Sequence, residues 1–347
     1  MKRPRANKPA RAAPPRARKP PPAASPPRAA PPPPVATPLA APPVAAPFAA
    51  SDILVASTIN LLPQGRLTLT SGLPVTTSDV AGSTLCYYTP ATGAVIPIYS
   101  GTDFIPYRFT ELSNDSTQSS TGKAGPAACG NNFNYFMMVW NDSGTLRLTR
   151  SPAWASDTSP GTGAGTAEIE MVNGIWVNKQ AITNGPAARR GTIVGGVRSN
   201  GAAQFDDILI RRYVSNIYNA VPRTMRAIET TASWNYTLAA FRPANGNAAN
   251  ALDWFHALNG VLTEAEVVGS YFNNTAGIIA STAIGIDGTV TASDCLRQQV
   301  SVASGFAGVP VNSSWKGYAG QGRHTATWLE YSGASGYKTL CRGYRNG

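Results

Sequence analysis

The stretch Gly65–Glu111, GRLTLTSGLPVTTSDVAGSTLCYYTPATGAVIPIYSGTDFIPYRFTEL, decides the fold class of this 347-residue chain. Apolar and polar residues alternate within it in three short runs, at Arg66–Thr70, Ser83–Thr89 and Val95–Tyr99. Glycine, proline, serine and aspartate separate these runs, and such alternation between turn residues is typical of half-buried antiparallel strands. No residue in the stretch belongs to a recognisable catalytic pattern. The stretch therefore predicts β-architecture.

Two hairpins are predicted further along the chain. The apolar run Phe133–Trp140 is followed by the alternating run Gly144–Arg150, with the tetrapeptide Asn141–Gly144 as the turn. Glu168–Val177 contains Asn-Gly between apolar residues, which is a strong short-range hairpin signal. Thr192–Arg198 is then expected to be a closing strand.

Two later segments carry mixed signals. Residues 204–221 fit a helical stripe and a strand about equally well. Leu252–Val268 includes a possible capping box at Thr263–Glu266, but Gly260 interrupts it, so two strands are predicted there instead. The remaining strands are expected at Asp253–Leu258, Leu262–Val268, Ala232–Leu238 and Gly277–Asp287, with Trp328–Tyr331 as the last.

The composition agrees with a β-rich structural protein. The hydrophobic fraction of 43% is enough for a core, whereas the charged fraction of 14% is well below the roughly 25% of ordinary soluble domains. Low charge together with 33 glycines and 29 prolines suits extended structure and burial between subunits.

Residues 1–50 differ from the rest of the chain. They contain 17 prolines, 16 alanines and nine lysines or arginines, with no acidic residue, so they contribute +9 to the formal net charge of +11. Such a segment is predicted to be disordered or polyproline II-like. It is either a solubilising leader or an arm that docks on an acidic surface, and nucleic acid is a possible partner only through this arm. The candidate docking residues are Lys2, Arg3, Arg5, Lys8, Arg11, Arg16, Arg18 and Lys19.

The cysteines and histidines do not predict a metal site or any cofactor. Cys86, Cys129, Cys295 and Cys341 are far apart, only two histidines accompany them, and zinc-ligand spacing is absent. We expect free, mostly buried thiols. No apolar window is long enough for a transmembrane helix and prolines interrupt any signal-peptide core, so we expect assembly in a cytoplasm-like compartment and no membrane partner.

Several longer segments together resemble a module of structural proteins from tailed bacteriophages and prophages. The resemblance starts with GRLTLTSGLPVTTSDVAGSTLCYYTP (65–90) and IPIYSGTDFIPYRFTELS (96–113), and covers roughly residues 64–290. It continues through GTLRLTRSPAW, RRGTIVGGVRSNG, RRYVSNIYNAVPRTMRAIETTASWNYTLAAFRPANG and AIGID, and more loosely WLEYSGASG. It implies a β-rich, trimeric virion appendage, with RRYVSNIYNAV as a strand that begins the C-terminal β-domain. No functional residues are carried over from the family.

Catalytic patterns are weak throughout. A glycan-cleaving spike would use paired carboxylates, and Glu168 with Glu170 on one strand face could approach the separation used by retaining glycosidases. Asp206-Asp207 and the pair Glu264/Glu266 are the other candidates. His256 and His324 have ordinary structural interpretations, and no nucleophile motif accompanies them.

The sequence thus predicts an all-β protein in three parts. A disordered Pro/Ala-rich basic arm (1–50) precedes an N-terminal β-domain (51–203) and a C-terminal β-sandwich of jelly-roll kind (204–347). The expected function is that of a non-enzymatic head or tail fibre or spike subunit, a homotrimer in the virion that contacts other virion proteins and a host-surface glycan or protein. A capsid decoration protein and a glycan-degrading spike are the alternatives. The receptor-binding candidates are aromatic residues expected on Gly/Ser-rich loops near the C-terminus: Trp315, Tyr318 and Tyr337.

Overall fold

The computed structural model describes residues 62–118, 125, 127–273, 279–293, 297–300, 309–333 and 339–343. The predictions for the arm, for the segment from Ile53, for Tyr337 and for Cys295 lie outside these residues. Residues Ile53–Gly347 belong to one compact unit, and everything below concerns that unit.

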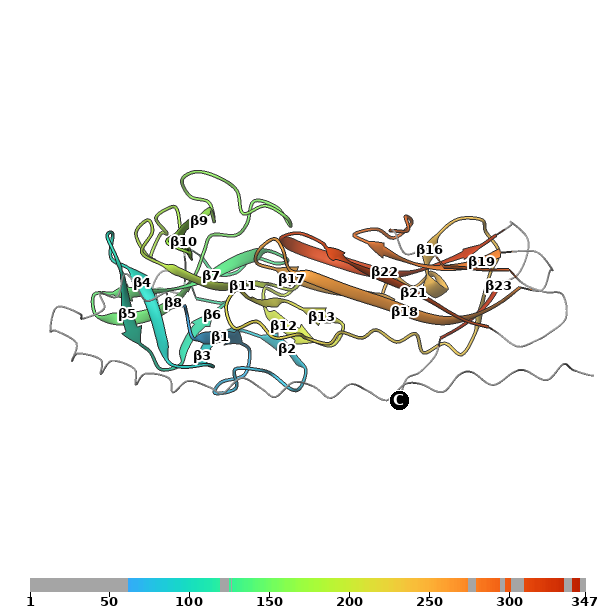
Figure 1. The fold of residues 1–347 in the computed structure, drawn as a ribbon, viewed down its shortest axis with the longest axis horizontal. Helices are drawn as coiled ribbons and strands as arrows, with labels where there is room; N and C mark the ends of the chain where they lie inside the picture. Colours follow the sequence, from blue (N-terminus) through green and yellow to red (C-terminus); the bar gives the residue numbers. More distant parts are fainter. Residues whose placement is uncertain are drawn as a thin grey trace, which may run out of the picture. The chain divides into compact units, whose positions relative to one another are not determined.

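The prediction of an all-β fold is confirmed (Figure 1). Among the described residues the regular helical structure is a single 3-10 turn, Ala244–Gly246, and no helix there is long and apolar enough to cross a membrane. A three-stranded sheet contains β1 (Gly65–Thr68), β3 (Leu85–Pro90) and β6 (Leu112–Asp115), and a two-stranded sheet contains β4 (Val95–Tyr99) and β5 (Phe104–Arg108). A six-stranded sheet has the order β8 (Thr145–Arg150), β7 (Asn134–Asp142), β11 (Thr192–Arg198), β10 (Ile175–Asn178), β9 (Ile169–Val172), with β14 (Val214–Asn216) also paired to β11.

Two larger sheets follow towards the C-terminus. The eight-stranded sheet has the order β2 (Val80–Ser83), β12 (Phe205–Ile208), β13 (Arg211–Arg212), β17 (Ala251–His256), β22 (Gly322–Ser332), β19 (Ile279–Ile286), β20 (Arg297–Val300), and β16 (Arg242–Pro243) pairs with β22. The four-stranded sheet has the order β15 (Trp234–Tyr236), β23 (Thr339–Gly343), β18 (Leu262–Asn273), β21 (Val309–Tyr318).

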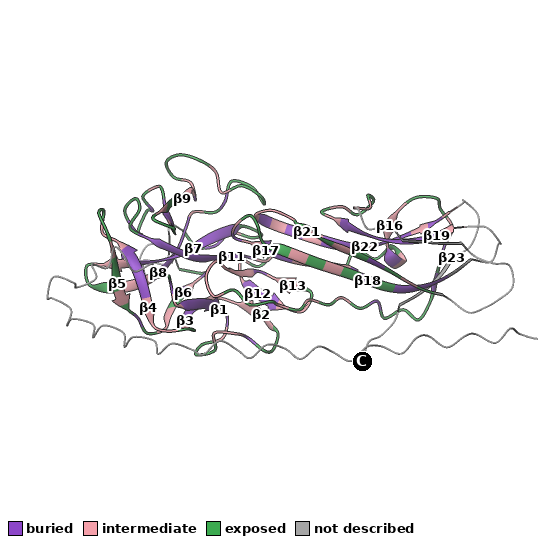
Figure 2. Cartoon of the chain, in the orientation of Figure 1, coloured by how far each residue is buried: buried purple, intermediate pink, exposed green. Residues whose placement is uncertain are grey.

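Strand β7 explains why a strand of the six-stranded sheet is a continuous apolar run in the sequence. Its side chains alternate between two cores, with Met137 and Val139 in a cluster that includes Leu67 and Tyr88 of the three-stranded sheet. Phe136 and Met138 point to the other face, where the cluster also contains Phe255 of β17. Because both faces are covered, alternation of polar and apolar residues is lost; β11 is buried along its length and β7 is buried as far as Trp140 (Figure 2).

The predicted hairpins form as expected. Strands β7 and β8 pair antiparallel, and Asn141 Oδ1 accepts a hydrogen bond from the Gly144 backbone at 2.7 Å in the turn between them. Strands β9 and β10 pair around Asn173 and Gly174, both of which have positive φ, as a two-residue hairpin turn requires.

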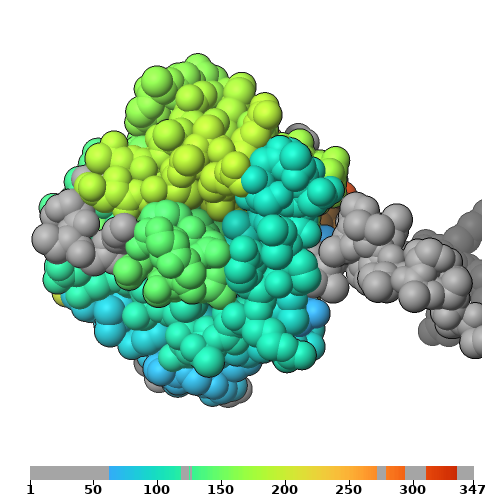
Figure 3. All heavy atoms as spheres, turned by 90° about the vertical axis from the view of Figure 1, so that its left-hand side faces the viewer, coloured from blue at the N-terminus to red at the C-terminus, as the bar shows by residue number. Residues whose placement is uncertain are grey.

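The β4–β5 hairpin lies beside the start of β11 and the residues just before it. Thr192 Oγ1 donates a hydrogen bond to the Pro97 carbonyl at 2.5 Å, and Arg190 Nη1 donates one to the Tyr99 carbonyl at 3.3 Å. Figure 3 shows this face, with the teal hairpin region against the green segments.

The C-terminal strands form a two-sheet sandwich with jelly-roll winding. Strand β17 pairs with β22 in one sheet, and the next strand, β18, pairs with β21 in the other. The chain therefore passes from one sheet to the other between β17 and β18, and passes back between β21 and β22 (Figure 1). The two segments run antiparallel to each other, with β22 beside β17 and β21 beside β18. This nested pairing is the winding of a jelly roll. Apolar residues of both sheets meet between them, among them Trp254, Val267 and Ile284.

Several finer predictions are corrected. Thr192–Arg198 was predicted to be a closing strand, but β11 lies at the centre of its sheet, between β7 and β10. Trp328–Tyr331 is not in the last strand, because β23 follows β22. Residues 204–221 contain three short strands, β12, β13 and β14, and no helix. RRYVSNIYNAV is therefore not one strand that begins the C-terminal domain, because β13 and β14 are separate and β14 pairs with β11. Trp315 and Tyr318 lie in β21 rather than on a loop.

The predicted domain boundary at residues 203/204 stays a prediction. The eight-stranded sheet runs across that position, because β2 pairs with β12 on its far side. Strand β14 likewise follows the boundary but pairs with β11, which precedes it.

The glycine pair in β11 generates a stability prediction. A Cβ atom on Gly195 would lie 2.2 Å from the Ser215 backbone oxygen, whereas one on Gly201 would meet only the Asn132 side chain, at 4.0 Å. We expect Gly195→Ala to lower the free energy of unfolding by about 3 kcal/mol, because β14 must move away from β11.

Gly201→Ala is the matched control and should change stability by less than about 0.5 kcal/mol, because both variants restrict the unfolded chain equally. Urea denaturation of the two variants measures the difference. Equal unfolding midpoints would contradict the close-approach argument.

Candidate functional site

A polar cavity of about 350 Å³ opens where the N-terminal sheets meet the sandwich. It is lined by charged and amide side chains from β11, β13, β17 and β22 and from the loops beside them. The lining residues are Asn132, Arg198, Asn200, Gly201, Arg211, Tyr213, Asp253 and Arg323.

The pairing of β17 with β22 determines which residues face this cavity. Asp253 and Phe255 share one face of β17, and Arg323, opposite Phe255, lies on the same face. Trp254 and its partner His324 lie on the other face. One face thus carries the charged residues of the cavity and the other faces the interior of the sandwich.

Tyr213, Asp253 and Arg323 are hydrogen-bonded to one another in the wall of the cavity. The Tyr213 hydroxyl donates a hydrogen bond to Asp253 Oδ2 at 2.8 Å, and Arg323 Nη2 donates to the same oxygen at 2.7 Å. Burial and the neighbouring Asp253 carboxylate both raise the pKa of the Tyr213 hydroxyl. The hydrogen bond to Asp253 in turn raises the pKa of Arg323. Tyr213 is therefore a neutral donor and Arg323 a permanent cation.

Two further arginines lie over the Tyr213 ring, with guanidinium carbons 5.7 Å (Arg198) and 5.4 Å (Arg211) from its centroid. Arg198 Nη1 donates to Asp157 Oδ1 at 2.7 Å and to Asn134 Oδ1 at 2.8 Å. Arg211 Nη1 donates to Asp206 Oδ2 at 2.6 Å.

The Nε atoms of Arg198 and Arg211 are buried and have no hydrogen-bond partner among the described residues. Each guanidinium thus donates hydrogen bonds through Nη1, and its Nε–H donates none within the described residues.

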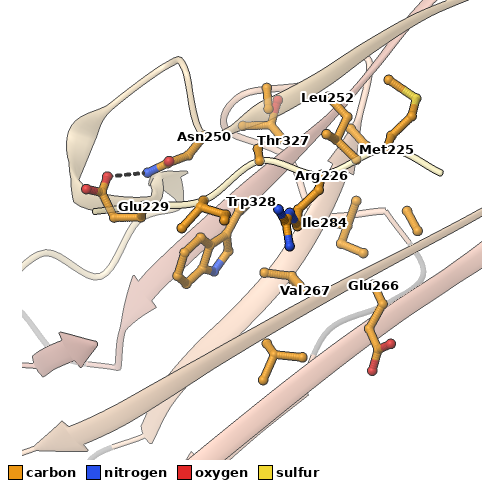
Figure 4. A pocket seen from close by; sticks show the side chains of 16 residues that line it. Met225, Arg226, Glu229, Asn250, Leu252, Glu266, Val267, Ile284, Thr327 and Trp328 are labelled. Atoms are coloured by element: carbon orange, nitrogen blue, oxygen red, sulfur yellow. Dashed lines mark hydrogen bonds between the residues drawn. The ribbon is translucent and has the colours of Figure 1, made fainter. Parts of the chain in front are cut away.

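A second, smaller cavity of about 160 Å³ lies at the edge of the sandwich (Figure 4). Val267, Ile284 and Trp328 form its apolar wall, and the Arg226 side chain extends among them. Beside it, Asn250 donates a hydrogen bond to Glu229 at 2.7 Å. Burial alone would raise the pKa of Glu229, but its hydrogen bonds from Thr231 and Asn250 lower it to about 2. This cavity thus combines an apolar wall from the sandwich core with the polar side chains of Arg226, Glu229 and Asn250.

The two histidines are brought together in the interior. Their ring centroids are 6.2 Å apart, and both rings lie close to Trp254. His324 Nδ1 is 2.8 Å from Asp287 Oδ2. No serine, threonine or cysteine nucleophile is hydrogen-bonded to either ring among the described residues, so no triad forms there.

The predicted receptor-binding aromatics separate. Trp315 faces inward and packs against the sandwich core. Tyr318 is 67% exposed on the outer face of β21, directly opposite Leu262, which is also exposed. The structure therefore does not bring these two residues into one site.

The candidate carboxylates are engaged in ion pairs, except for Glu266, which accepts a hydrogen bond from Asn312 Nδ2 at 3.4 Å. Glu168 bonds Lys179 at 2.7 Å, and this contact together with the Gly163 backbone lowers its pKa to about 2. Glu170 bonds Arg189 at 2.7 Å. Asp206 and Asp207 are buried and bond Arg211 and Arg212, while Glu264 pairs with Lys316 across β18 and β21. An ionised, paired Glu168 does not suit the role of a general acid near neutral pH.

The cysteines agree in part with their prediction. Cys86 and Cys129 are free and buried, and burial raises the pKa of both thiols, that of Cys129 to about 11. The described residues contain no group of three or more histidine, cysteine, aspartate or glutamate side chains placed to hold a metal ion.

Comparisons of the chain with protein-family models, with curated proteins and with solved structures find no match. The resemblance to phage fibre proteins therefore stays a prediction.

Sequence reasoning missed the polar cavity. Arg198 ends β11, Arg211 forms β13 and Arg323 lies in β22, so their positions in the sequence give no sign that they meet. The only local signal is the run of basic and acidic residues around Asp206-Asp207 and Arg211-Arg212 in an otherwise weakly charged body.

The histidine cluster generates a pH prediction. Burial and the neighbouring His324 lower the pKa of His256 from 6.5 to about 4. The unfolded chain therefore binds a proton at this residue between about pH 6.5 and 4 that the folded chain excludes, so folding stability falls with acidification across that range, by up to about 1.4 kcal/mol per pH unit. Above about pH 6.5 this residue is neutral in both the folded and the unfolded chain, so the loss of stability is absent there.

We expect His256→Gln to flatten this part of the stability-versus-pH curve, measured by urea denaturation at half-unit intervals. Glu229 and Asp287, whose pKa values are also lowered, act in both proteins and cancel in the comparison. Parallel curves for the wild-type chain and the variant would contradict the assignment.

Proposed function

We propose that this chain is a non-enzymatic virion structural protein, a head or tail fibre or spike subunit of a tailed bacteriophage. The observation that carries the proposal is a rigid all-β body with a preformed polar cavity, whose bordering carboxylates are already bonded to arginine or tyrosine. Such a site favours binding over acid–base chemistry, because a paired carboxylate is a weak proton acceptor. The module resemblance over residues 64–290 supports the proposal that this body is part of a virion appendage.

A homotrimer is the proposed assembly. The outer face of β18 and β21 exposes Leu262, Val268 and Tyr318, which is costly for an isolated chain and is relieved by burial against a second copy. Closed cyclic symmetry would repeat that burial three times. The basic arm then attaches to other virion proteins, and repeated copies of the body meet a host-surface glycan or protein with increased avidity.

The proposal predicts the mass of the full-length chain in solution. We expect light scattering to give about 109 kDa, three times the 36.3 kDa chain, and the oligomer to resist SDS at room temperature. A monomer at micromolar concentration would contradict the fibre assignment and favour a decoration protein.

The proposal also predicts the absence of glycan cleavage. Capsule or lipopolysaccharide incubated with the purified chain should release no reducing sugar, since Glu168 and Glu170 are held in ion pairs. Release that is lost on Glu168→Gln and retained by Glu111→Gln, a change at a hydrogen-bonded carboxylate outside the candidate pairs, would instead establish the hydrolase function.

A further inference from the structure

We propose that the polar cavity formed by Arg198, Arg211 and Arg323 binds a carboxylate-bearing sugar residue. That the carboxylate belongs to a sugar rests on the proposed function. That it is a carboxylate rests on the geometry of the cavity alone.

The unpaired donors of two guanidinium groups indicate that the ligand is an anion. Arg198 and Arg211 each bond carboxylates only through Nη1, so their Nε and Nη2 groups make no hydrogen bond within the described residues. Nε–H and Nη2–H lie on one side of a guanidinium and form the planar fork that fits a carboxylate through two parallel hydrogen bonds. Arg198 is 4% exposed, so its unpaired Nε–H is costly until an acceptor arrives.

The charges around the cavity disfavour a ligand that carries more than one negative charge. Arg198, Arg211 and Arg323 line the cavity with Asp253, and Asp157 and Asp206 bond Arg198 and Arg211, so the formal charges of the cluster balance. Arg323 is already committed to Asp253, which it bonds through Nε at 3.1 Å and through Nη2 at 2.7 Å. The fixed negative charge of Asp253 disfavours a dianion such as phosphate beside it.

The remaining wall suits hydroxyl groups. Asn132 lies at the side of the cavity, and its exposed amide makes no hydrogen bond among the described residues, whereas the amide of Asn200 is already bonded to Asp206 and to the backbone of Ala202 and Gln204. Amides both donate and accept, as sugar hydroxyls require. The volume of about 350 Å³ is near the lower limit of small-molecule pockets, about 300–1,000 Å³, and therefore fits one sugar residue with an exit for the next.

The cavity is held in place before any ligand binds. Arg198 is fixed by Asp157 and Asn134, Arg211 by Asp206, and Tyr213 packs between the arginines and Asp253. Asp206 is itself held by the Gly82 backbone at 2.8 Å and by Asn200 at 3.0 Å. Few side chains must be ordered on binding, which favours measurable affinity for a single sugar.

Isothermal titration of the full-length chain with glucuronate, N-acetylneuraminate, glucose and inorganic phosphate tests the proposal. We expect a dissociation constant near 1 mM for at least one of the two acidic sugars, binding of glucose at least tenfold weaker, and weakening as sodium chloride is raised. Glucose binding as tightly as the acidic sugars, phosphate binding more tightly than both, or no binding of either acidic sugar at 10 mM would overturn it.

Matched variants locate the site. Arg211→Gln should weaken binding about tenfold or more, because it removes one charged fork. Arg147→Gln is the control, since Arg147 has the same exposure of 36% and pairs with one carboxylate, but lies outside the cavity. Arg211→Lys retains the charge beside Asp206 without Nε–H and should also weaken binding, which separates fork geometry from charge if Arg211→Gln folds poorly. Equal affinities for Arg211→Lys and wild type would overturn the fork argument.

The outcome is separable from that of the proposed function. A trimer that fails to bind either acidic sugar refutes the ligand but leaves the fibre assignment intact. A monomer that binds acidic sugars through Arg211 supports the site and contradicts the fibre assignment.

Discussion

Close approach of three backbones at Gly195 and Gly196 is the constraint on which the described structure depends. A Cβ on Gly195 would collide with the Ser215 carbonyl of β14, and one on Gly196 would come within 2.8 Å of both the Tyr135 carbonyl of β7 and the Phe255 ring of β17. Without side chains at these positions, β11 can sit at the centre of its sheet while β14 and Phe255 close over it. Phe255 also stacks edge-on against Trp154, 5.4 Å between centroids, which joins the sandwich to the N-terminal core.

The polar cavity is a consequence of that junction. Arg198, two residues beyond Gly196 on β11, and Arg323, on the same face of its sheet as Phe255, are brought together because the glycines let the two sheets approach. Charge in this body is concentrated at such junctions, where buried Asp206 and Asp207 bond Arg211, Arg212 and Arg223. Removing one partner of a buried ion pair leaves an uncompensated buried charge and destabilises the fold more than the loss of an exposed ion pair does. These buried pairs therefore fix the geometry around the cavity.

Sequence patterns predicted strands best where one face is buried or a turn has special chemistry. The Asn173-Gly174 turn and the β7–β8 hairpin were located from local residues alone, because positive φ and alternation are local properties. Strand order was not predictable. β11 became central rather than terminal, and Trp315 turned inward, because pairing partners come from residues far along the chain.

The sequence by itself determined the all-β class, the hairpin turns and the distinct composition of residues 1–50, since each follows from spacing or composition within a short window. Only the tertiary structure decided which charged residues meet. Arg198, Arg211, Asp253 and Arg323 are spread over more than a hundred residues, and no local rule relates them. Their assembly depends on register between strands and on two glycines that allow close packing, both of which are properties of the folded chain.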